Sequence, residues 1–264
     1  MTGKSNSIDI FIVESGNSRL HTGYFENGKL TERHVYNYPD NAEHLHELIA
    51  QAIGDSKPSI VAASSVSGKL REKLYTTLYE IFGNCLHVAQ STLDIPVKVT
   101  YSAPEMIGID RVFAAHAAFQ HFNGPCVVID AGTAVTVDAV DKDGTFLGGF
   151  IFPGAELLGK SLSDNTSLPL VNFSNESREI GTSTETCIGR AIFAGFAAAV
   201  NELADIASNA SGKTNNVAVT GGNSDQILPA LKRKVEHLPN LTMTGIALLA
   251  ESLPVFSVSK NKID

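Results

Sequence analysis

Two stretches of this chain share one pattern of apolar and polar positions. In each, an apolar run leads to a short acid-x-Gly-polar tip, and an alternating segment then ends at a turn glycine. The first tip begins at Glu14 and its turn glycine is Gly28, whereas the second begins at Asp130 and its turn glycine is Gly144. Asn-Gly and Asp-Gly pairs between alternating segments are strong hairpin signals. The repeat therefore predicts a duplicated core with one hairpin in each copy.

The remaining apolar spacing predicts helices and short strands around both copies. Helical spacing covers residues 41–53, 68–82, 106–121, 184–210, 223–234 and 244–252. Short apolar runs predict further strands over residues 59–63, 86–88, 134–140, 145–152 and 217–220. Thr182 with Glu185 three residues later predicts a capping box at the start of the longest helix. Strands followed by helices in each half predict an α/β fold with mixed sheets, and we expect two domains, residues 1–122 and 123–264.

The composition is that of a soluble globular protein, with 43% hydrophobic and 18% charged residues. A net charge of −8 argues against a nucleic-acid surface. The most continuous apolar run, residues 191–200, is shorter than the ~20 residues of a membrane span, and residues 1–9 lack a signal-peptide core. Cys85, Cys126 and Cys187 show no metal-ligand spacing. We therefore expect a cytoplasmic protein with reduced thiols and no membrane or nucleic-acid partner.

Each tip combines groups that suit a phosphate. Loop N–H groups and small polar side chains can donate hydrogen bonds to it, and an acid after a buried strand lies where open sheets bind ligands. Two such tips facing each other across a cleft would hold a polyphosphate at two points. For either tip alone, a plain turn is the alternative, because Asp and Gly are common turn residues.

Asp110 and Arg111 are charged neighbours in an otherwise almost uncharged segment. Adjacent helical residues do not face each other, so each needs its own partner. One interpretation is an acid in a first helical turn and an arginine that bridges the domains. The other is a general base beside a guanidinium that binds a carboxylate or phosphate. Separately, the strand 217–220 ends at Gly221-Gly222, which would let the backbone approach a flat ligand such as adenine.

Residues 154–161 match the P-loop pattern G-x-x-x-x-G-K-[ST], but their context argues against a P-loop. Glu156 would place negative charge near the phosphates, and Pro169 leaves no room for the long helix that should follow. Substitution of Lys160 is therefore expected to leave nucleotide turnover almost unchanged. The histidines show no zinc-ligand spacing, and no G-x-S-x-G sequence indicates a serine hydrolase.

Taken in order, these segments resemble type III pantothenate kinases, members of the actin, sugar kinase and Hsp70 superfamily with duplicated ribonuclease-H-like (actin-like ATPase) domains. The resemblance spans nearly the whole chain. It rests on residues 16–18, Tyr101 and Pro104 before 108–111, then 130–138, 148–154 and 167–169, Thr184 with Gly195, and 220–222.

The resemblance implies a homodimeric transferase that uses ATP and Mg²⁺ to phosphorylate the primary hydroxyl of pantothenate. The product would be 4′-phosphopantothenate, in the first step of coenzyme A biosynthesis. Asp110 would be the general base, and Asp130 would bind a monovalent cation, K⁺ or NH₄⁺. Pantothenate would contact Tyr101, Gly108, Ile109, Arg111 and Thr184 near the subunit interface. ATP would contact Glu14, Ser15, Gly16, Asn17, Ser18, Arg19, Gly132, Thr133, Gly221 and Gly222.

The first tip departs from the family pattern at two positions. The family has Asp where this chain has Glu14, and Thr where it has Ser18. The extra methylene could displace the carboxylate by about an ångström and weaken the positioning of metal and phosphate. We therefore expect Glu14→Asp to maintain or raise the rate, while a large loss would show a site rebuilt around the longer acid. The alternatives are a non-catalytic accessory protein of this family and a kinase for another small alcohol.

Overall fold

The computed structural model describes residues 9–16, 19–37, 44–66, 68, 70–171 and 179–252. The chain divides into two compact units. The first holds residues up to Val97, residues 102–117 and those from Leu241 onward, and the second holds Lys98–Tyr101 and Ala118–Asn240. The units are therefore discontinuous in sequence. The predicted domain boundary lay between residues 122 and 123. The division in the structure instead passes through α3 (Ile109–Phe122), and it assigns the last helix to the first unit.

The first unit is built on a mixed five-stranded sheet of order β3-β2-β1-β4-β5. Its strands are β1 (Ile10–Ser15), β2 (Arg19–Glu26), β3 (Lys29–Asn37), β4 (Ile60–Ser65) and β5 (Leu86–Ala89). Its helices are α1 (Leu45–Ile53), α2 (Arg71–Phe82), α7 (Leu241–Ser252) and most of α3, with short 3₁₀ turns η2 (Gly83–Cys85), η3 (Thr92–Asp94) and η4 (Pro104–Met106).

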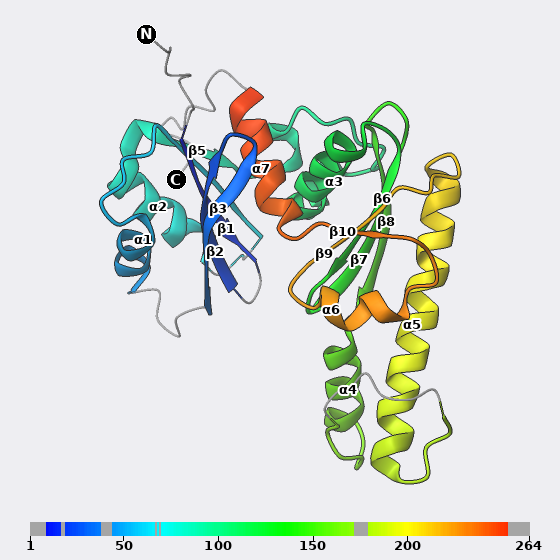
Figure 1. Ribbon diagram of the computed structural model, residues 1–264. Coiled ribbons are helices and arrows are strands. Elements are labelled where there is room, and N and C mark those ends of the chain that lie inside the picture. Colours follow the sequence, from blue (N-terminus) through cyan, green and yellow to red (C-terminus); the bar gives the residue numbers. More distant parts are fainter. Residues whose placement is uncertain are drawn as a thin grey trace. The chain divides into compact units, whose positions relative to one another are not determined.

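Alternation along β1 gives this sheet two apolar faces. Phe11 and Val13 pack in one core cluster with residues of α1 and α2, such as Leu78. Ile10 and Ile12 are also fully buried, and they point to the other face because side chains alternate along a strand. That face is covered by α7, which packs on β1 and β4 (Figure 1).

The second unit has a sheet of order β10-β9-β6-β7-β8. Its strands correspond, in this order, to β5, β4, β1, β2 and β3 of the first sheet. Its strands are β6 (Cys126–Ala131), β7 (Ala134–Val140), β8 (Phe146–Pro153), β9 (Val217–Thr220) and β10 (Glu236–His237). Its helices are α4 (Ala155–Asp164), α5 (Thr184–Ala210) and α6 (Ser224–Ile227), the last followed by the 3₁₀ turn η5 (Leu228–Ala230).

The two sheets repeat one connection pattern, which confirms the predicted α/β fold with mixed sheets. In the first, β1 pairs antiparallel with β2 and parallel with β4. In the second, β6 pairs antiparallel with β7 and parallel with β9. The β2–β3 turn has left-handed backbone at both Asn27 and Gly28, whereas in the β7–β8 turn only Gly144 has a positive φ. Both predicted hairpins form, with different turns.

Helix α5 is the longest helix and the main cover of the second sheet. It packs on β6, β7 and β8, and it buries Phe196, Val200 and Ala204 in the core of that unit (Figure 1). Within the described part of the chain, α5 alone has the length and apolar composition that a membrane crossing requires, and 39% of its most apolar window is buried. A core helix can satisfy the same criteria.

Two local predictions were wrong in detail. The helix predicted over residues 223–234 ends at Ile227, because Pro229 lacks the N–H that an α-helix needs, and the 3₁₀ turn η5 follows. The capping box of α5 begins at Ser183 and not at Thr182. Ser183 has extended backbone, and its hydroxyl accepts a hydrogen bond from the N–H of Thr186 at 3.2 Å.

Candidate active site

The two acidic tips occupy equivalent positions in their sheets. Glu14 lies opposite His21 on β2 and beside Ser64 on β4. Asp130 lies opposite Thr136 on β7 and beside Thr220 on β9. Each acid is therefore the next-to-last residue of a central strand, flanked by an antiparallel and a parallel neighbour. This is the strand end at which open sheets bind ligands.

In each tip the glycine donates a backbone hydrogen bond to a residue that follows it. The N–H of Gly16 donates to the carbonyl oxygen of Arg19 at 3.0 Å, and that of Gly132 donates to Ala134 at 3.0 Å. Asn17 and Ser18, predicted to bind ATP, lie outside the described residues. Ser15 is buried, and its hydroxyl oxygen accepts a hydrogen bond from Ser65 at 3.0 Å.

The carboxylate of Glu14 is held by a cross-strand contact. Nδ1 of His21 lies 2.8 Å from Oε2 of Glu14, and the two side chains are 24% and 12% exposed. The other oxygen, Oε1, lies on the side of the tip, since a Cβ added at Gly16 would be 3.7 Å from it. The contact of His21 with Glu14 was not predicted from the sequence. The register of the β1–β2 hairpin is the signal that could have found it.

Asp110 stands in the first turn of α3, and the pKa of its carboxyl group is raised. Its Oδ1 accepts a hydrogen bond from the backbone N–H of Arg111 at 2.9 Å. Burial among protein atoms raises the pKa of Asp110, and the negative charge of Glu14 raises it further, whereas the N–H and the charge of Arg111 lower it. An acid with a raised pKa is a stronger base near neutral pH. The first unit thus brings Glu14 and Asp110 within electrostatic reach of each other.

The residues around Asp110 are closely packed. A Cβ at Gly108 would lie only 2.7 Å from Oδ1 of Asp110. Ile109 and Arg111 are 4% and 6% exposed, so the guanidinium is largely withdrawn from water. A desolvated arginine interacts strongly with a carboxylate.

Tyr101 belongs to the second unit, where it lies beside the edge strand β8. Val99 forms a parallel bridge with Phe146, and the N–H of Thr100 donates to the carbonyl of Phe146 at 3.0 Å. A Cβ at Gly148, whose φ is +105°, would lie 3.5 Å from the Tyr101 ring. The tyrosine is 38% exposed. The chain just before Tyr101 is therefore held against β8, and Tyr101 itself is partly open to solvent.

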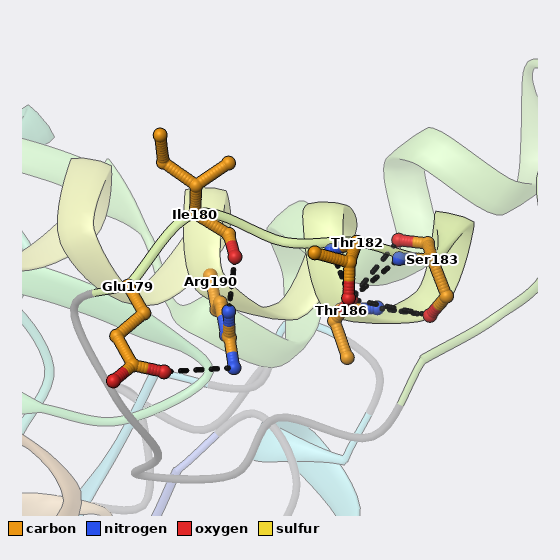
Figure 2. A network of polar contacts seen from close by, with 6 residues as sticks. All are labelled: Glu179, Ile180, Thr182, Ser183, Thr186 and Arg190. Atoms are coloured by element: carbon orange, nitrogen blue, oxygen red, sulfur yellow. Dashed lines mark hydrogen bonds and ion pairs between the residues drawn. The ribbon is translucent and has the colours of Figure 1, made fainter.

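Thr184 is the first residue of α5 and is exposed. The capping residues Ser183 and Thr186, which flank it, are joined by reciprocal hydrogen bonds (Figure 2). The guanidinium of Arg190 donates to the carbonyl of Ile180 and lies 3.7 Å from Glu179 (Figure 2). These contacts fix the chain just before α5 and thereby the position of Thr184.

The second tip lies against Gly221, a position where only glycine fits without strain. Gly221 has a φ of +96°, and a Cβ there would overlap the carbonyl oxygen of Ala131 and the carboxylate of Asp130. The N–H of Asn223 donates to the same carbonyl at 2.8 Å. The structure therefore brings the Gly221-Gly222 turn against the tip at Asp130. Asn223 was not predicted, because its contact depends on the path of the turn.

The P-loop match at residue 154 has a different structural role. Helix α4 begins at Ala155, directly after β8, so no loop remains to wrap a phosphate. The N–H of Gly154 donates to the carbonyl of Thr133 at 2.9 Å, and a Cβ at Gly154 would lie 2.6 Å from that oxygen. Lys160 is exposed on α4. Gly154 thus supports the second tip from the end of β8.

The predicted site residues fall into two groups. Those in the first unit are Glu14, Ser15, Gly16, Arg19, Gly108, Ile109, Asp110 and Arg111. Those in the second are Tyr101, Asp130, Gly132, Thr133, Thr184, Gly221 and Gly222. Within the described ranges, no cluster of three or more His, Cys, Asp or Glu side chains forms a metal cage. A magnesium ion that arrives with ATP needs no such cage, since it commonly uses one or two carboxylates together with the phosphates.

Two sheets of one topology, each with an acidic tip at the end of its central strand, are the arrangement of the actin-like ATPase and sugar kinase fold. Solved structures of this fold include acetate kinase from Porphyromonas gingivalis, at 9% identity over 92% of this chain and 99% of that one, with a TM-score of 0.55. A Campylobacter jejuni protein described as a candidate transcriptional activator of the Baf family has a TM-score of 0.60, at 18% identity over 91% of this chain and 97% of that one.

The sequence comparisons are more specific. A family profile described as type III pantothenate kinase matches residues 10–206. The type III pantothenate kinase of Nitrosococcus oceani is 30% identical over 92% of this chain and 94% of its own length. The type III pantothenate kinase of Persephonella marina is 28% identical over 89% of this chain and 95% of its own length. The chain belongs to the type III pantothenate kinase family and is a kinase.

Proposed function

We propose that this protein transfers the γ-phosphoryl group of ATP to the primary hydroxyl of pantothenate, the first step of coenzyme A biosynthesis, in the cytoplasm. The single observation that carries the proposal is the carboxyl group of Asp110, which stands in the first turn of α3 and accepts a hydrogen bond from the backbone N–H of Arg111 at 2.9 Å. It occurs in a chain whose sequence relatives are named type III pantothenate kinases. A kinase for an alcohol needs a base of this kind, since the acceptor hydroxyl must lose its proton.

In the proposed reaction the pantothenate oxygen attacks the γ-phosphorus of ATP and the bond to the β–γ bridging oxygen breaks. The hydroxyl proton passes to Asp110, and ADP leaves with the bridging oxygen. Arg111, which follows Asp110 in the first turn of α3, would neutralise the carboxylate of pantothenate. Tyr101, Gly108, Ile109 and Thr184 would line the same substrate.

The two tips would bind the phosphates of ATP through their backbone N–H groups and small side chains. These groups are residues 14–19 of the first tip, together with Gly132 and Thr133 of the second. Glu14 would assist the magnesium ion, which supplies neutralisation of the phosphate charge. Gly221 and Gly222 would approach the adenosine. Asp130, at the end of β6, would bind the monovalent cation.

We further propose a homodimer whose contact includes the exposed apolar side chains of the second unit. These are Ile151 on β8, Leu157 on α4, Leu168, Leu170 and Ile180, and Ile180 is 89% exposed. Large exposed apolar groups on neighbouring elements commonly mark protein–protein contacts. Sedimentation of the wild type and of Ile180→Asp tests this, with a lighter species expected for the variant.

The test of the proposed reaction is product formation from pantothenate and ATP, followed by mass spectrometry. It is run with potassium, ammonium and sodium, and with a small sugar or acetate as alternative acceptors. We expect 4′-phosphopantothenate with potassium or ammonium, and no comparable product from the other acceptors. Nucleotide binding without product under every condition would favour the accessory role, and a faster reaction with another alcohol would favour the third alternative.

A further inference from the structure

The contact between Glu14 and His21 is largely shielded from solvent, since the two side chains are 12% and 24% exposed. Its atoms Nδ1 and Oε2 are 2.8 Å apart. The two residues lie directly opposite each other on β1 and β2, so their side chains share one face of the sheet. An ionised carboxylate only accepts hydrogen bonds, and Nδ1 of His21 must therefore be the donor.

A second His–Glu pair offers an internal comparison. His121 and Glu236 of the second unit are also 2.8 Å apart, but their side chains are 43% and 50% exposed. Exposed pairs contribute little, because water screens them and competes for their hydrogen bonds. The pair at Glu14 is more shielded, so its contact should fix the carboxylate more firmly. The two pairs join the same residue types, through Nδ1 of His21 and Nε2 of His121, and they differ in shielding.

The length of the acid matters for this contact. An aspartate at position 14 would withdraw its carboxylate by about one carbon–carbon bond, ~1.5 Å. The contact with His21 would then exceed hydrogen-bond distance. Conversely, Glu14 reaches His21 with Oε2 while Oε1 stays on the side of Gly16. His21 thus places Oε2 of the longer acid, while Oε1 remains on the side of the tip.

We propose that His21 is a positioning residue that fixes the Glu14 carboxylate in the first tip, so that Glu14 and His21 act as one unit on bound ATP. The assignment rests on the proposed function of this tip. It reverses the expectation drawn from the sequence for Glu14→Asp. With His21 present, the shorter acid loses its partner and the rate falls.

A double-mutant cycle tests the unit directly. The variants are Glu14→Asp, His21→Leu and the double variant, with kcat, KM for ATP, and the Kd of the non-hydrolysable analogue AMP-PNP with Mg²⁺ as readouts. We expect each single variant to lose about tenfold in kcat/KM for ATP and the double variant to lose little more, as coupled residues do. His21→Asn should retain most of the activity, because its amide nitrogen can donate from a similar position. Additive losses would overturn the proposal, as would an unaffected His21→Leu.

Controls separate this proposal from the reaction itself. His121→Leu, which breaks the exposed pair, should leave kcat, KM and Kd unchanged. If the wild type does not phosphorylate pantothenate, the proposed reaction fails, but coupling in the AMP-PNP Kd still decides the role of His21. If His21→Leu does not fold by circular dichroism, Glu14→Asp and His21→Asn decide it. A Glu14→Asp variant as active as the wild type, with an unchanged Kd, would refute it.

Discussion

Gly108→Ala is expected to impair catalysis by displacing the carboxylate of Asp110. A Cβ at Gly108 would lie 2.7 Å from Oδ1 of Asp110, and real Cβ contacts below 3.0 Å essentially never occur. The same oxygen accepts a hydrogen bond from the N–H of Arg111 at 2.9 Å. The carboxylate must therefore turn away from the new methyl group. This movement weakens the hydrogen bond from the N–H of Arg111.

The size of the effect follows from the displacement. Ordinary van der Waals contact begins at 3.4 Å, so Oδ1 must move by about 0.7 Å (3.4 − 2.7). A misplacement of about 1 Å in an active site can cost about 10²-fold in rate, and we expect a loss of roughly 10- to 100-fold in kcat. A loss of that size corresponds to about 1.4–2.7 kcal/mol of transition-state stabilisation. Gly108 does not have a positive φ, so alanine adds no backbone strain there.

The assay is the steady-state rate of pantothenate phosphorylation at saturating ATP. Gly124→Ala is the matched control, since the nearest atom to its added Cβ is the carbonyl oxygen of Phe122 at 3.9 Å. We expect wild-type kcat for the control and wild-type unfolding temperatures, within a few degrees, for both variants. A Gly108→Ala enzyme with kcat within twofold of the wild type would refute the assigned position of the carboxylate.

Three further predictions concern the charges and the second tip. Because burial raises the pKa of Asp110, the native state binds more protons than the unfolded chain between the ordinary pKa of 3.8 and the raised pKa. The stability of the wild type is then lost as the pH rises through that window. Asp110→Asn should therefore raise the unfolding temperature at pH 7, and this gain should disappear as the pH falls towards 4. Because Glu14 raises the pKa of Asp110, Glu14→Gln should shift the acidic limb of the kcat/KM profile to lower pH. Gly221→Ala must adopt a positive φ and overlap the carbonyl of Ala131, so calorimetry should show AMP-PNP binding weakened by about tenfold.

Much of the fold was predictable because its elements carry strong local periodicity. The predicted bounds of α5, residues 184–210, and of β9, residues 217–220, agree with the structure. A long amphipathic pattern or a β-branched run fixes such elements locally. The end of α6 was missed because the apolar spacing continued past Pro229. The place of α7 was missed because the sequence does not state which sheet a largely apolar helix will cover.

The candidate site shows the same division between local and long-range information. Glu14, Asp110 and Asp130 were proposed as site residues from their own surroundings in the sequence. The contact of His21 with Glu14 was not predicted, because it depends on the register that sets the two residues opposite each other. Gly154 and Asn223 support the second tip through backbone contacts to Thr133 and Ala131, and no side-chain pattern records these. The raised pKa of Asp110 likewise depends on burial, which follows from the fold.

The most direct test of the central claim is the rate of phosphoryl transfer to pantothenate by Asp110→Asn in a single turnover, with AMP-PNP affinity measured on the same preparation. We expect wild-type affinity for the nucleotide and a rate lower by at least about 10²-fold, since the asparagine keeps the shape of the side chain and cannot accept the proton. A variant that binds the nucleotide and transfers the phosphoryl group at the wild-type rate would show that Asp110 is not the base.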